Sequence, residues 1–111
     1  MCGIVAMFSS AAPIDRDRLE RATATLDHRG PDARRTWVDE HGRVGLGHTR
    51  LGIIDLQGGD QPLSNEDGSI VAVVNGEIYD HERLRAELVA AGHRFRTGSD
   101  SEVLVHLYAE H

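Results

Sequence analysis

The chain enters an apolar segment almost at its first residue. Residues 3–8, GIVAMF, carry no charge and include the β-branched Ile4 and Val5, a composition typical of a buried strand. A strand that starts this close to the N-terminus holds the terminus inside the fold. Cys2, the single cysteine among the 111 residues, therefore belongs to the folded structure rather than to a free tail.

The composition excludes several classes of protein. All 12 basic residues are arginine and 18 residues are acidic, giving a net charge of −6, so a nucleic-acid interface is not expected. Without lysine there is no Schiff base, pyridoxal phosphate anchor or GxxxxGK phosphate loop, and one cysteine allows neither an internal disulfide nor a CxxC metal site. With no signal peptide and no apolar run of ~20 residues, we expect one cytoplasmic domain and no membrane contact.

Hydrophobic periodicity and turn residues predict an α+β domain with antiparallel hairpins. A polar loop at residues 40–42 should join two of its strands. Asp80 should cap the middle helix, and the Ser99 to Glu102 capping box should start the last one. The last helix should turn four apolar side chains toward the core, namely Val103, Leu104, Leu107 and Tyr108. The predicted helices span residues 15–27, 80–92 and 99 onward, and the predicted strands span residues 3–8, 36–39, 44–50, 53–56, 70–74 and 93–97.

Cys2 is the residue most suited to covalent chemistry. Once Met1 is removed, a thiol and a free α-amine lie on the same residue. The amine titrates near ~7.7–8.0 and the thiol near ~8.5, so the amine can take the thiol proton directly or through one water. The alternative is a chance cysteine after the start codon or a small buried apolar group.

Other residues offer partners for a substrate amide, carboxylate or ammonium group. Asn75 and Gly76 end a predicted strand with a carboxamide and an unhindered backbone N–H, two donors suited to an oxyanion, although Asn-Gly is also common in ordinary turns. Arg50 could hold a carboxylate and Asp100 an ammonium group, against the alternatives of a surface charge and a helix cap. The seven histidines are scattered without HExxH spacing, so they predict no metal site. The segment GLGHTR at residues 45–50 falls within a strand and lacks the third glycine of a dinucleotide loop.

Six ordered blocks of the sequence together resemble the class II glutamine amidotransferase domain. They are MCGIV (residues 1–5), HRGPD (28–32), GHTRL (47–51), QPL (61–63), VNGEIY (74–79) and GSDSE (98–102). More narrowly they resemble the N-terminal glutaminase domain of glutamine-hydrolysing asparagine synthetases, a branch that Pro31 favours. The resemblance implies an N-terminal-nucleophile hydrolase fold, an αββα sandwich of antiparallel sheets, with residues 1–111 as its N-terminal part and the synthetase domain absent.

The resemblance also implies a role for each candidate residue. The thiol of the N-terminal cysteine would attack the side-chain amide of glutamine, and Asn75 with the Gly76 N–H would stabilise the oxyanion. Arg50 would bind the α-carboxylate, Asp100 the α-ammonium group, and Glu77 would line the glutamine pocket. Ammonia would leave, and water would release glutamate from a γ-glutamyl thioester. No cofactor and no metal is implied for this step.

The resemblance leaves the ammonia acceptor open. In the family, ammonia passes to a synthetase domain where ATP and magnesium activate an acid, and these residues supply no such site. The alternatives are a truncated or split fragment that needs a complementary chain, a module that binds glutamine without hydrolysing it, and the glutaminase half of an enzyme that amidates a specialised metabolite. The oligomeric state, including a homo-oligomer, is also left open.

Overall fold

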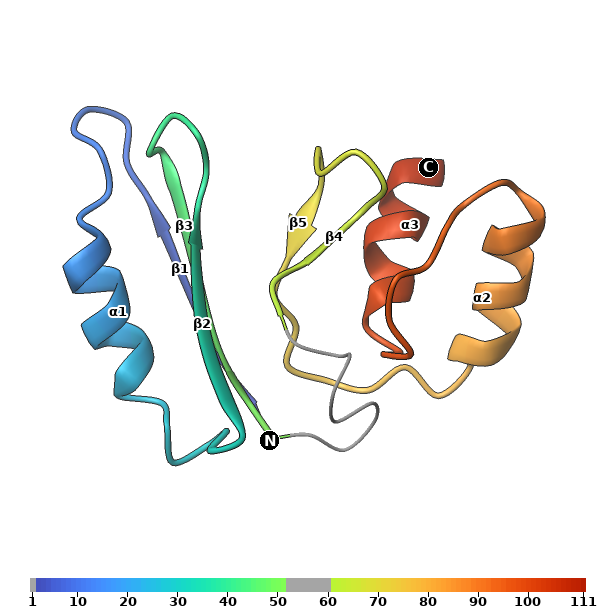
Figure 1. Cartoon of the computed structure of the whole chain (residues 1–111), viewed down its shortest axis with the longest axis horizontal. Helices are drawn as coiled ribbons and strands as arrows, with labels where there is room; N and C mark the ends of the chain where they lie inside the picture. Colours follow the sequence, from blue (N-terminus) through green and yellow to red (C-terminus); the bar gives the residue numbers. More distant parts are fainter. Residues whose placement is uncertain (1, 52–60) are drawn as a thin grey trace.

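The computed structural model describes residues 2–51 and 61–111. In space, a helix, a three-stranded sheet, a two-stranded sheet and two further helices lie next to one another in that order (Figure 1). The elements are β1 (Gly3–Phe8), α1 (Arg16–Ala24), β2 (Ala33–Val38), β3 (Val44–Arg50), β4 (Leu63–Ser64), β5 (Val71–Ala72), α2 (His81–Ala90) and α3 (Glu102–Glu110). The predicted α+β class with antiparallel sheets is confirmed. None of the described helices combines the length and the apolar character that a bilayer crossing needs.

The first sheet contains the N-terminal strand and the predicted hairpin. Its strand order is β1-β3-β2, with both pairs antiparallel. The hairpin closes where Asp39 Oδ1 accepts the N–H groups of Arg43 at 2.6 Å and Val44 at 2.9 Å. β2 begins at Ala33, earlier than the predicted residue 36. The predicted strand left out two exposed arginines that also pair with β3.

α1 packs against the outer face of this sheet through the buried Leu19 and Thr23 (Figure 1). The Asp15 carboxylate caps the helix by accepting backbone N–H groups of the first turn. A Cβ at Gly47 would lie 2.0 Å from Thr23 Oγ1, so glycine in β3 allows the close approach of helix and sheet. The helix ends at Ala24, earlier than predicted, because the next backbone hydrogen bonds join residues three apart instead of four.

The second sheet is shorter than the sequence predicts. Of the strand expected at residues 70–74, only Val71–Ala72 forms a strand, β5. It pairs with β4, which the sequence did not predict. The strand predicted at residues 53–56 lies outside the described residues.

The strand predicted at residues 93–97 is wrong. Three of its backbone N–H groups donate to side-chain carboxylates instead of to a neighbouring strand. The N–H of Arg94 donates to Glu66 at 3.0 Å, and two further N–H groups of the segment donate to Glu102. A segment bonded in this way cannot offer the same groups to a sheet.

Both predicted side-chain caps in the C-terminal half are also wrong. Asp80 stands at the N-cap of α2, but its carboxylate pairs with Arg83 and makes no capping hydrogen bond. At the start of α3, Ser99 Oγ accepts the N–H of Ser101 rather than that of Glu102. The helix begins at Glu102, the last residue of the predicted box, and not after Ser99.

The buried face of α3 differs from the predicted apolar face. Val103 is buried as predicted, but Leu104 and Tyr108 are 38% and 76% exposed. Two polar residues, Glu102 and His106, are buried in their place. Glu102 accepts hydrogen bonds from Thr97 and His106 in the interior, which a count of apolar residues does not anticipate.

Candidate functional site

Cys2 lies at the end of the first sheet, immediately before β1. Leu51 N–H donates to Cys2 Sγ at 3.4 Å, and Sγ is 3.9 Å from the Leu51 carbonyl oxygen. Arg29 Nε–H donates to the Cys2 carbonyl at 3.1 Å. The thiol is partly exposed and forms no disulfide. The cysteine is thus held by the residue after β3 and by the loop after α1, with its sulfur accessible.

Arg50 lies beside Cys2 at the end of β3. Gly3 is paired with Thr49, so the next residues along the two strands are Cys2 and Arg50. Thr49 Oγ1 donates to the Leu26 carbonyl on the α1 side of the sheet. Because side chains alternate along strands, Cys2 and the buried Arg50 both face the other side, toward the second sheet.

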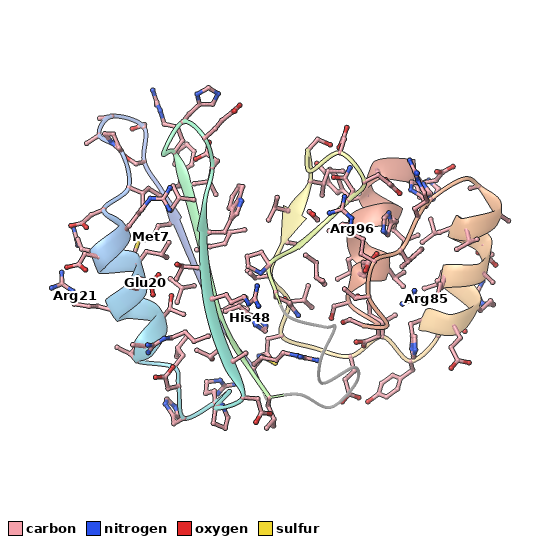
Figure 2. All side chains as sticks on the ribbon, viewed as in Figure 1. Met7, Glu20, Arg21, His48, Arg85 and Arg96 are labelled. Carbon is pink, nitrogen blue, oxygen red and sulfur yellow. The ribbon has the colours of Figure 1, made fainter. Side chains whose placement is uncertain are left out.

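Asn75, Gly76 and Glu77 form an exposed segment after β5. His48 Nε2–H donates to the Val74 carbonyl at 3.0 Å, and Figure 2 shows His48 between the two sheets. A Cβ at Gly76 would meet no heavy atom within 4 Å. The segment is therefore attached to the inner face of the first sheet at one end and open to a ligand at Gly76.

Asp100 joins this segment to the beginning of α3. Its carboxylate is buried, and Oδ2 accepts the Ile78 N–H at 2.6 Å. The predicted residues thus form two groups, Cys2 with Arg50 and the 75–77 segment with Asp100. Within the described residues, the hydrogen bonds of Cys2 go to Leu51 and Arg29 and not to the second group.

Sequence reasoning missed two residues that position the segment after β5. Both act on Val74, where Gln61 Oε1 accepts the N–H and His48 contacts the carbonyl. His48 had a recognisable signal, because it stands two positions before Arg50 and shares its face of the strand. No local pattern indicates that Gln61 contacts Val74, which lies 13 residues further along the chain.

An open cleft of about 730 Å³ lies between the β2–β3 hairpin and the β4–β5 turn. Trp37, Val44 and Val71 are among the residues that line it. Val44 pairs with Phe8, at the opposite end of β1 from Cys2. The cleft is therefore separate from the candidate site.

Comparison with known proteins identifies the family. A family model described as a glutamine amidotransferase domain matches residues 1–111. The chain belongs to this family. The glutamine amidotransferase domain is similar to glutamine-hydrolyzing asparagine synthetases, at 52% identity for that of Sandersonia aurantiaca, 51% for Asparagus officinalis and 49% for asparagine synthetase 1 of Arabidopsis thaliana. Each alignment covers 100% of this chain and 21%, 18% and 19% of the relative, respectively, so the chain spans about a fifth of their length.

Proposed function

We propose that the chain hydrolyses glutamine to glutamate and ammonia with Cys2 as the nucleophile. The observation that carries this proposal is the family match over residues 1–111 together with an accessible thiol at position 2. The order of helix, sheet, sheet and helices supports the N-terminal-nucleophile hydrolase sandwich as the fold (Figure 1).

The proposed reaction begins after removal of Met1. The freed α-amine takes the thiol proton, and Sγ attacks the side-chain carbonyl carbon of glutamine. The carbonyl electron pair moves onto oxygen, where the Asn75 carboxamide and the Gly76 N–H stabilise it. Collapse expels ammonia, which receives the proton held by the α-ammonium group. Water, deprotonated by the same amine, then attacks the γ-glutamyl thioester and releases glutamate and the thiol.

The remaining candidates bind the amino-acid end of glutamine. Arg50 shares a sheet face with Cys2 and supplies a fork of donors for the α-carboxylate. The Ile78 N–H orients the buried Asp100 carboxylate, so the substrate ammonium group meets a fixed anion. Glu77 lines the same pocket from the exposed segment.

The ammonia is proposed to supply an amide-forming site outside these residues. The named relatives are glutamine-hydrolyzing asparagine synthetases of which this chain covers about a fifth. We infer an ATP- and magnesium-dependent site of that type in a longer protein or in a complementary chain. Ile4 and Phe8 are 48% and 78% exposed on the sheet face that carries Cys2, which favours cover by further protein.

The requirement for a free α-amine tests the proposed chemistry. The chain is prepared with Met1 removed and, separately, with Met1 retained, and intact mass establishes each state. We expect equal amounts of glutamate and ammonia from glutamine with the processed chain and neither product with the unprocessed one. Equal activity of the two forms would exclude the α-amine as the base.

A further inference from the structure

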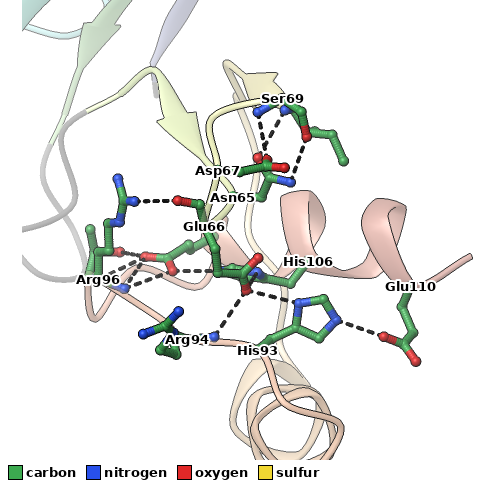
Figure 3. A network of polar contacts seen from close by, with 12 residues as sticks. Asn65, Glu66, Asp67, Ser69, His93, Arg94, Arg96, His106 and Glu110 are labelled. Atoms are coloured by element: carbon green, nitrogen blue, oxygen red, sulfur yellow. Dashed lines mark hydrogen bonds and ion pairs between the residues drawn. The ribbon is translucent and has the colours of Figure 1, made fainter.

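Two histidines and a glutamate from separate elements meet in the C-terminal half of the molecule (Figure 3). Glu66 lies in the β4–β5 turn, His93 follows α2, and His106 lies in α3. Glu66 Oε1 is 3.0 Å from Nδ1 of His93 and 3.0 Å from Nδ1 of His106. One ligand atom from each residue lies within 4.8 Å of the other two. The sequence predicted no metal site, because these residues are far apart along the chain and come together only in the folded structure.

The outer nitrogen of each imidazole faces a further carboxylate. His93 Nε2 is 2.7 Å from Glu110 Oε2, and His106 Nε2 is 3.0 Å from Glu102 Oε2. A carboxylate accepts the ring proton at Nε2 and leaves the lone pair on Nδ1. Metal-binding histidines are typically oriented in this way, with the second nitrogen donating to a carboxylate.

The inner nitrogen of His106 lacks a hydrogen-bond partner among the described residues. His106 is fully buried, and its Nδ1 makes no hydrogen bond although Glu66 Oε1 is 3.0 Å away. The same oxygen accepts the Arg94 N–H at 3.0 Å. His93 Nδ1 is also hydrogen-bonded to this oxygen at 3.0 Å, so the one carboxylate oxygen already has two partners and the buried His106 Nδ1 has none. An unsatisfied buried nitrogen is unfavourable, and a cation among the three atoms would give His106 Nδ1 a partner.

We propose that Glu66, His93 and His106 bind a zinc ion, with water completing the coordination. Two imidazole nitrogens and one carboxylate oxygen form a set that suits zinc, whereas magnesium and calcium prefer oxygen ligands. Zinc bonds of ~2.0–2.1 Å place tetrahedral ligands about 3.3 Å apart. The two 3.0 Å separations in the cluster are close to that value, so small side-chain movements admit the ion.

The ion has a structural role that is independent of glutamine hydrolysis. It links the β4–β5 turn, the connection between α2 and α3, and α3 itself. The carboxylates of Glu102 and Glu110 add negative charge around it. The guanidinium of Arg96 donates to the Glu66 carbonyl at 2.8 Å, which fixes the turn that presents the Glu66 carboxylate.

Zinc titration of the chelator-treated chain tests this site. Calorimetry should show one zinc ion per chain, and a hundredfold excess over Kd should raise Tm by about 10 °C. Magnesium should leave Tm unchanged. Glu66→Gln and His106→Gln should each lose the Tm rise, whereas His41→Gln should keep it, because His41 is an exposed histidine on the β2–β3 hairpin that pairs with Glu40 and not with the cluster.

A spectroscopic measurement on a chain with the cluster unchanged tests the site even if the Glu66 and His106 variants fail to fold. Cobalt(II) added to the Cys2→Ser chain should give the visible absorption of a four-coordinate ion, and zinc should shift the Nδ1 resonances of His93 and His106. Neither signal can arise from a thiolate, because this variant has no cysteine. Absence of these signals together with no zinc-dependent Tm rise would overturn the proposal, as would an undiminished rise in Glu66→Gln.

Discussion

At the scale of single residues, Asn75 is expected to act on the transition state rather than on the fold. Its side chain is exposed after β5, so Asn75→Ala should leave stability nearly unchanged. Loss of one oxyanion donor typically lowers kcat by about 10²–10³. Steady-state kinetics should therefore show a large fall in kcat with little change in KM. A wild-type kcat in this variant would remove Asn75 from the oxyanion site.

The candidate residues differ in how far the sequence could identify them. The chemistry of an N-terminal thiol and amine makes Cys2 a candidate nucleophile, and residue type alone suggests Arg50 for a carboxylate and Asp100 for an ammonium group. The family resemblance adds that both groups would belong to glutamine. The same resemblance did not indicate that Asp100 binds the Ile78 N–H. Such a contact depends on how α3 packs beside the segment after β5, which no local pattern describes.

At the scale of elements, the contact between α1 and β3 depends on glycine. A Cβ at Gly47 would approach Thr23 Oγ1, which is buried and donates to the Leu19 carbonyl at 2.7 Å. Gly47→Ala should therefore lower the free energy of unfolding by about 1–3 kcal/mol. Chemical denaturation measures the change, and Gly76→Ala is the matched stability control because open space surrounds that position. Equal stability of the two variants would contradict the close contact.

The β2–β3 hairpin should contribute a stability that depends on pH. Hydrogen bonds from the Val44 and Arg43 N–H groups outweigh the opposing effect of burial and hold the pKa of Asp39 below its ordinary value of 3.8. The ionised carboxylate therefore stabilises the fold above pH 3.8, and this contribution is lost as pH falls through the folded-state pKa. Asp39→Asn should be less stable at neutral pH, and denaturation should show the difference shrinking in acid. A difference independent of pH would contradict this role.

The elements show where sequence patterns succeed and where they fail. β1 and β3 have the predicted bounds, because β1 is a continuous apolar run and β3 follows the predicted polar loop at residues 40–42. The strand predicted at residues 93–97 failed because its N–H groups bond to Glu66 and Glu102, residues outside the segment. Local propensity carries no information about such distant acceptors.

At the scale of the whole molecule, the structure is thin and one sheet face is partly uncovered. Its extents are 41 × 30 × 18 Å, and Phe8 is 78% exposed on β1, an edge strand of the described sheet. Apolar edges of this kind favour self-association. Sedimentation velocity should show concentration-dependent association of the chain, reduced by Phe8→Asp. A wild-type chain that stays monomeric at high concentration would contradict this expectation.

The most direct test of the proposed function detects the bond that Cys2 forms with the substrate. The processed chain is mixed with glutamine, quenched in acid during turnover and measured by intact mass and peptide mapping. We expect a γ-glutamyl adduct on the peptide that contains residue 2, and neither adduct nor ammonia release with Cys2→Ala. Ammonia release by Cys2→Ala at the wild-type rate would contradict the assignment of Cys2 as the nucleophile.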